Sequence, residues 1–145
     1  MLVFEEGTDI FETSAKTITI TVNCVGVMGK GIAKTAREQS PELFRRYKKW
    51  CEAGKIRPGV PRLTMGGRYL LFPTKDHWRQ PSQYAWIKEG LQRIRKNIDH
   101  LESLAVPPLG CGNGGLEWRE VKLLTIGYLA SLDIPIHIYS PRNWV

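Results

Sequence analysis

The sequence has few cysteines, and their spacing excludes several classes of protein. Cys24, Cys51 and Cys111 are an odd number of thiols that lie far apart, with neither a CxxC pair nor a dense disulfide framework. The three histidines are scattered along the chain and share no metal-ligand spacing with these cysteines. We therefore expect reduced thiols, no metal site and no cofactor.

Long apolar runs are also missing. The longest, at residues 18–22 and 134–139, are too short to span a bilayer. The first residues, MLVFEEGTDIFE, lack the basic start and the apolar stretch of a secretory signal. Repeats, low-complexity tracts and linkers are absent too. These absences predict one domain over residues 1–145, with no membrane association and a cytoplasmic location.

The composition is that of an ordinary globular protein with a basic surplus. Hydrophobic residues make up 42% of the 145 residues, which is enough to enclose a core and excludes wholesale disorder. The 21 Lys and Arg residues exceed the 14 Asp and Glu residues, for a net charge of +7. Such a surplus is typical of proteins with polyanionic partners, although it also serves simply to keep a surface soluble.

Strand patterns alternate with helical patterns along the chain. We expect strands at 2–4, 18–22, 62–64, 69–72, 104–106 and 134–139, and helices at 32–39, 41–54, 83–101 and 117–131. Ser40 is the expected N-cap of the helix that starts at Pro41. In the third helix, apolar residues continue through Ile98 to Leu101. The alternation predicts an α/β sandwich with a mixed, largely parallel sheet and a ligand site beyond the carboxyl ends of its strands.

Two glycine-rich loops lie between an expected strand and an expected helix. They are NCVGVMGKGIA at residues 23–33 and PPLGCGNGGLEW at residues 107–118. The first loop matches neither a P-loop nor a full GxGxxG fingerprint. Backbone N–H groups in such loops and at the helix ends behind them bind anions, so the pair is suited to hold a diphosphate from both sides. Alternatively, the glycines only permit tight turns.

Three single residues each have at least one functional and one purely structural interpretation. Asp9 follows the first strand, where its carboxylate either accepts a hydrogen bond from an exocyclic amine such as that of adenine or caps a short turn. Lys75 follows a strand and serves as a general acid, an electrostatic clamp, a nucleophile toward a sugar aldehyde or a plain surface lysine. Cys111 is a catalytic thiol or a small buried filler.

Basic and aromatic residues interleave at residues 45–50 and 75–79, a mixture that suits single-stranded nucleic acid. In the first segment Tyr47 and Trp50 share a helix face with Leu43, which predicts that they lie in the core. In the second, Trp78 is the better candidate for stacking on a base. His77, Trp78 and Arg79 are therefore the expected DNA-contacting residues.

These motifs together resemble those of the macrodomain family, whose members bind ADP-ribose in a three-layer α/β/α fold. The resemblance runs from Gly7 to Tyr139. The two glycine loops and the segment FPTKDHWR are most similar to the branch that contains DarG, the DNA ADP-ribosyl glycohydrolase and antitoxin of the DarT toxin. The same branch includes a human hydrolase that removes terminal ADP-ribose from glutamate.

The resemblance implies a role for each matching residue. Asp9 and Ile10 meet the adenine end, the two glycine loops enclose the diphosphate, and Asn23 lies near the distal ribose. Lys75 and Asn23 are the implied catalytic residues. The residues implied to contact ADP-ribose are Asp9, Ile10, Asn23, Gly29, Lys30, Gly31, Ile32, Ala33, Thr74, Gly110, Cys111, Gly112, Asn113, Gly114, Gly115 and Leu116.

One position departs from the glutamate-directed relative, in which the lysine works with an aspartate of the second loop. This chain has Gly114 at that position. The difference favours the DarG-like mechanism, in which Lys75 acts with the substrate's own groups. The expected activity is hydrolysis of the bond between ADP-ribose and thymine in single-stranded DNA, which reverses the modification made by a DarT-like toxin. The alternatives are a hydrolase for acidic protein side chains and a non-catalytic reader of ADP-ribose.

Overall fold

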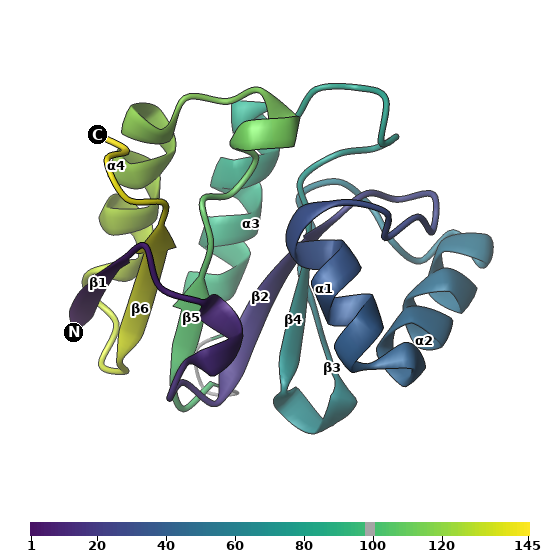
Figure 1. The fold of residues 1–145 in the computed structure, drawn as a ribbon, viewed down its shortest axis with the longest axis horizontal. Helices are drawn as coiled ribbons and strands as arrows, with labels where there is room; N and C mark the ends of the chain where they lie inside the picture. Colours follow the sequence, from purple (N-terminus) through teal and green to yellow (C-terminus); the bar gives the residue numbers. More distant parts are fainter. Residues whose placement is uncertain (98–100) are drawn as a thin grey trace.

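A computed structural model of the chain describes residues 1–97 and 101–145 (Figure 1). Its centre is one six-stranded sheet in the order β1-β6-β5-β2-β4-β3. The strands are β1 (Leu2–Glu6), β2 (Thr17–Val22), β3 (Arg62–Thr64), β4 (Tyr69–Pro73), β5 (Leu104–Val106) and β6 (Ile136–Ser140). Every neighbouring pair is parallel except β3 with β4, which confirms the mixed, largely parallel sheet.

Four helices cover the two faces of this sheet. They are α1 (Gly31–Gln39), α2 (Pro41–Glu52), α3 (Tyr84–Lys96) and α4 (Trp118–Leu129). The helices α1 and α2 pack together against one face, and α3 and α4 pack together against the other (Figure 1). The expected three-layer α/β/α sandwich is confirmed. Among the described residues, no helix combines the length and the apolar character needed to cross a membrane.

Alternate residues of each central strand supply the two halves of the core. In β4, Tyr69 and Leu71 pack with α1 and α2, whereas Leu70 and Phe72 pack with α3 and α4. This is the period of two that an extended strand imposes, and both faces of β4 are apolar because both are covered. Helix α3 lies so close to the sheet that a Cβ atom on its Gly90 would overlap the Phe72 ring.

Several expected element boundaries move inward in the structure. The third helix ends at Lys96 rather than at 101, because Asn97 forms the C-cap and its side-chain amide donates 2.9 Å to the Arg93 carbonyl. Ile98 lies outside the described residues. The last strand begins at Ile136 rather than at 134, because Pro135 has no N–H group to donate to the ladder. The Ser40 N-cap is confirmed, since its hydroxyl accepts from the Leu43 N–H at 3.2 Å.

The five parallel strands all end at the same edge of the sheet. The segments that follow them begin at Gly7, Asn23, Thr74, Pro107 and Pro141. Both glycine-rich loops therefore lie at this edge, as the sequence predicts, and the site is built there.

Candidate functional site

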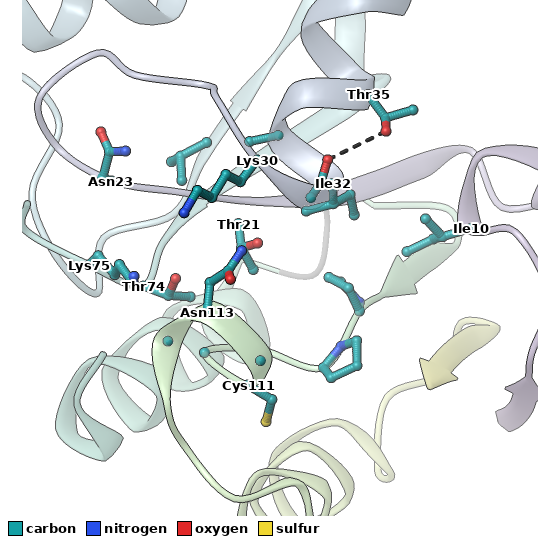
Figure 2. A pocket seen from close by; sticks show the side chains of 18 of the residues that line it. Ile10, Thr21, Asn23, Lys30, Ile32, Thr35, Thr74, Lys75, Cys111 and Asn113 are labelled. Carbon is teal, nitrogen blue, oxygen red and sulfur yellow. Dashed lines mark hydrogen bonds between the residues drawn. The ribbon is translucent and has the colours of Figure 1, made fainter. Parts of the chain in front are cut away.

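A cavity of about 1160 Å³ opens at the carboxyl edge of the sheet. Residues that follow each of the five parallel strands in the sequence line it, including the starts of both glycine loops (Figure 2). Its volume is somewhat above the roughly 300–1,000 Å³ that is usual for small-molecule sites. Such a cleft accommodates an elongated ligand with two different ends.

The β2–α1 loop is held in shape by the side chain of Asn23. Its Oδ1 accepts from the Val25 N–H at 3.0 Å and the Val27 N–H at 3.4 Å, while its Nδ2 donates to the Val27 carbonyl at 2.8 Å. Tyr47 is a fully buried residue of α2, and its hydroxyl lies 2.8 Å from both Oδ1 and the carbonyl oxygen of Asn23. Burial raises the pKa of Tyr47, so this hydroxyl remains a donor. Asn23 borders the cavity, but most of its hydrogen-bonding capacity serves the loop.

Helix α1 begins at this loop with its N-terminus beside the cavity. Its N-cap, Lys30, makes no side-chain capping bond, and its first turn contains no acidic residue. The N–H groups of Gly31, Ile32 and Ala33 precede the first intrahelical hydrogen bond that the helix forms, from the Lys34 N–H to the Lys30 carbonyl. All three residues line the cavity. The helix thus presents donors and the positive end of its dipole to an anion.

The β5–α4 loop faces α1 across the cavity. A Cβ atom placed on Gly31 would lie 3.9 Å from the Asn113 amide nitrogen, which marks where the two loops approach one another (Figure 2). Residues Gly112–Gly114 form a short 3-10 turn, and Gly115 ends it with φ of 81°, a conformation that glycine favours. The Gly114 carbonyl accepts from the Ser82 N–H at 2.9 Å, which ties this loop to the segment before α3.

Lys75 lies on the wall between the two loops. The Thr74 N–H donates to the Val22 carbonyl at 3.0 Å and extends the β2–β4 ladder, and the Cys24 N–H donates to the Asp76 carbonyl at 2.9 Å. The backbone on both sides of Lys75 is therefore fixed. Its Nζ donates to the Trp78 carbonyl at 3.2 Å, which holds the side chain at the cavity rather than extended into solvent.

The cavity lining has more cations than carboxylates. Among the described residues its charged groups are Lys30, Lys75, Arg79 and the single carboxylate of Asp9. Lys30 and Lys75 extend toward one another from different loops (Figure 2). Partial burial, and secondarily the positive charge of Lys30, lower the pKa of Lys75 below its usual range. The amine of Lys75 therefore has a larger neutral fraction than that of an ordinary surface lysine.

Asp9 lies at the other end of the cavity. Its Oδ1 accepts from the Phe11 N–H at 2.9 Å, so the expected cap of the short turn at Ile10–Glu12 is confirmed. One carboxylate oxygen makes this bond, and the residue also lines the cavity. Tyr139 and Trp144, from β6 and the C-terminal segment, complete this end, and the sequence reading did not find them. They arrive there because β6 pairs with β1 in the sheet, a contact with no local sequence signal.

The structure brings almost all of the expected ligand-contacting residues to one cavity. Leu116 is the exception, because its side chain points into the core with α3 and α4 instead of lining the cavity. Of the expected DNA-contacting residues, Trp78 and Arg79 border the cavity and His77 does not. The His77 ring lies beside the Trp78 ring, and its Nδ1 accepts from the Arg79 N–H at 3.1 Å, so it shapes this loop.

The three thiols are free, as expected, and none is activated. Burial raises the pKa of Cys111 to about 11, and burial together with the nearby Asp76 carboxylate raises that of Cys24 to about 12. The pKa of Cys51 is also raised by burial. A half-buried thiol with a raised pKa is a poor nucleophile, so Cys111 fits the role of a filler beside the cavity.

This arrangement, two glycine loops and a helix N-terminus at the carboxyl edge of a six-stranded α/β/α sheet, is matched by comparison with known proteins. The family model described as Macro domain matches residues 20–124. The chain belongs to the macrodomain family.

Within this family the chain is closely related to the macrodomains of DarG proteins. It superimposes on the macrodomain of Thermus aquaticus DarG with a TM-score of 0.90 and 37% identity, covering 97% of this chain and 99% of that one. It superimposes equally well on Thermosipho africanus DarTG in complex with ADP-ribose, with a TM-score of 0.90, 38% identity and coverage of 97% and 42%.

A curated relative gives the same relationship by sequence. The Mycobacterium tuberculosis protein named DNA ADP-ribosyl glycohydrolase is 39% identical over 152 aligned positions, which cover 99% of this chain. The chain spans 43% of the length of that relative.

Proposed function

We propose that this protein is a DNA ADP-ribosyl glycohydrolase, which removes ADP-ribose from thymidine in single-stranded DNA and reverses the modification made by a toxin. The observation that carries the proposal is the position of Lys75, whose amine is held in the cavity between two anion-binding loops. The DarG relatives support it, because their similarity extends over the whole domain.

The cavity orients ADP-ribose in one direction. The diphosphate lies between the N–H groups of Gly31–Ala33 and the loop at Gly110–Gly115, where its charge meets the N-terminus of α1 and Lys30. The adenine lies toward Asp9 and Ile10, where the carboxylate accepts from the exocyclic amine. The distal ribose then falls beside Lys75 and Thr74. Asn23 keeps the β2–α1 loop in shape there and has one amide N–H left for the sugar.

The reaction breaks the bond between the anomeric carbon of the distal ribose and a thymine nitrogen. Water supplies the new C–O bond, and a proton passes to the departing base. Positive charge develops on the sugar as the C–N bond weakens, and negative charge develops on the base. Lys75 either stabilises the departing base as an ammonium or acts as a nucleophile. In the second case the neutral amine attacks C1 of the ring-opened ribose and displaces the base, and water then hydrolyses the resulting imine to release ADP-ribose and the free amine. The lowered pKa of Lys75 increases the fraction of the neutral amine relative to an ordinary lysine.

The proposal includes the protein's partners and its location. ADP-ribosylated single-stranded DNA is the substrate, and Trp78 and Arg79 at the cavity edge are its proposed contacts. A DarT-like toxin is the proposed source of the modification, in line with the toxin–antitoxin fusion from Thermosipho africanus named DNA ADP-ribosyl transferase-DNA ADP-ribosyl glycohydrolase. Such a pair would act on DNA in the cytoplasm.

The test measures release of ADP-ribose from a thymidine-ADP-ribosylated oligonucleotide and from a glutamate-ADP-ribosylated protein. Wild type, Lys75→Ala and the control Lys16→Ala are compared; Lys16 is exposed at the opposite edge of the sheet, before β2. Wild type and Lys16→Ala are expected to release ADP-ribose from the DNA substrate. Lys75→Ala should still bind ADP-ribose but should no longer release it from DNA. Release from protein alone would replace the proposal with a protein hydrolase. Binding without release from either substrate would make the protein a reader.

A further inference from the structure

An exposed aromatic side chain stands at the edge of the cavity. Trp78 is 43% exposed, and the guanidinium of Arg79 lies 4.6 Å from its ring centroid. Tryptophan side chains in globular domains are usually much more buried than this. An exposed indole with a neighbouring cation at the opening of a site is a surface on which a nucleobase stacks.

The β2–α1 loop continues this surface. Val25 and Val27 are 45% and 41% exposed. The loop is fastened to the segment that carries Trp78, because Cys24 donates to the Asp76 carbonyl through its N–H at 2.9 Å and to the Lys75 carbonyl through its thiol at 3.4 Å. The apolar loop and the indole therefore form one connected rim.

Helix α2 adds positive charge beyond the loop. A Cβ atom on the buried Gly26 would lie 3.5 Å from Cγ of Lys48, so this lysine packs directly against the loop. Lys48 is exposed and forms no salt bridge among the described residues, unlike Arg45, which pairs with Glu42 at 2.8 Å. We call the surface made by Trp78, Arg79, Val25–Val27 and Lys48 the rim strip.

Two exposed carboxylates adjoin the rim strip. They are Asp76, in the loop that carries Trp78, and Glu52, one turn after Lys48 on α2. These two carboxylates balance the cations Arg79 and Lys48, so the strip and its neighbours together have a net charge close to zero. A purely electrostatic partner gains little from such a surface, whereas a chain that alternates phosphates with flat bases uses both the cations and the exposed apolar groups.

We propose that the rim strip binds the DNA strand next to the modified thymine: the adjacent base stacks on Trp78, and the backbone crosses the β2–α1 loop toward Lys48. This inference rests on the proposed function and adds to it a determinant of substrate choice. It implies that the enzyme prefers a modified strand over a modified nucleoside, although both present the same ADP-ribose to the cavity.

The experiment compares kcat/KM for ADP-ribosyl-thymidine, the free nucleoside, with that for the same modification inside a short single-stranded oligonucleotide. Wild type should favour the oligonucleotide. Trp78→Ala should lower this preference about 5- to 150-fold, the range expected for one lost stacking contact, and Trp78→Phe should retain most of it. Lys48→Gln should make the dependence of log KM on log salt shallower by about 0.7, the value for one phosphate on a single strand.

The control variant is Lys16→Gln, which removes one charge at the opposite edge of the sheet and should leave the preference unchanged. Two results would overturn the proposal that the rim strip binds the strand and would leave the proposed function intact. One is equal kcat/KM for nucleoside and oligonucleotide in wild type, and the other is an equal loss of kcat/KM on both substrates in Trp78→Ala. Absence of release from both DNA substrates would overturn the proposed function and the rim strip together.

Discussion

Gly114 of the β5–α4 loop rests directly on Ser82, the second residue before α3. A Cβ atom at position 114 would lie 2.5 Å from the Ser82 hydroxyl oxygen and 3.1 Å from its Cβ. The same two residues are joined by the hydrogen bond from the Ser82 N–H to the Gly114 carbonyl. A side chain at 114 therefore fits only if the Ser82 hydroxyl turns away and the Ser82 Cβ gives way by a few tenths of an ångström. The same applies to the aspartate that the resemblance implies at this position in the glutamate-directed relative.

We predict that Gly114→Ala destabilises the protein by about 1–3 kcal/mol, as overpacking does, and weakens ADP-ribose binding. Thermal unfolding and isothermal titration calorimetry measure the two effects. Adding Ser82→Gly should restore most of both, because it removes the two atoms that clash. The control is Gly127→Ala on α4, where a Cβ meets nothing within 4 Å and should be neutral or stabilising. A double variant as impaired as Gly114→Ala alone would refute this explanation.

Tyr47→Phe should loosen the β2–α1 loop without changing any cavity-lining residue. It removes the hydroxyl that lies 2.8 Å from two buried oxygens of Asn23, and the loss should cost about 1–2 kcal/mol of unfolding free energy. The affinity for ADP-ribose should fall several-fold, because the N-terminus of α1 follows this loop. Urea unfolding and calorimetry test both values. Tyr128→Phe on α4, remote from the loop, is the matched control, and an equal effect there would contradict the prediction.

The sequence predicts the cavity well and its supports poorly. Glycine loops after parallel strands are local patterns, and parallel strands bring their ends together, so residues such as Gly31 and Asn113 could be placed at one site. The supports of the cavity depend on contacts between residues that are far apart in the sequence, and no local pattern predicts such contacts. They involve the Tyr47 hydroxyl, Ser82 and Trp144. Leu116, which the resemblance implies to contact ADP-ribose, packs against the core and does not line the cavity, because membership of a loop does not say which way a side chain points.

Cys111 should be dispensable for turnover although it lines the cavity. With a pKa of about 11, its thiolate fraction near pH 7 is on the order of one part in ten thousand. Cys111→Ser should therefore retain most of the wild-type kcat. Alkylation of Cys111 by iodoacetamide, followed by mass spectrometry, should be slow at neutral pH and accelerate as the pH approaches 11. A large loss of kcat in Cys111→Ser with ADP-ribose binding intact would reinstate the thiol as a catalyst.

Lys30 should contribute to the pH dependence of the reaction through its effect on Lys75. A positive charge nearby disfavours the ammonium form, so removing it in Lys30→Met raises the pKa of Lys75. If the neutral amine reacts, kcat rises with pH through this pKa. If the ammonium acts, kcat falls with pH through it. In both cases the limb moves to higher pH in the variant, and only part of the shift is recovered, because burial is the larger cause of the lowered pKa.

The measurement is the pH profile of kcat on the modified oligonucleotide for wild type, Lys30→Met and Lys30→Arg. Lys30→Arg keeps the charge and should leave the limb where it is in wild type. Because Lys30 also faces the proposed diphosphate site, KM is expected to rise in Lys30→Met, and kcat at saturating substrate separates that loss from the titration of Lys75. The direction of the limb then identifies which form of Lys75 acts. An unmoved limb in Lys30→Met would mean that another group controls the reaction.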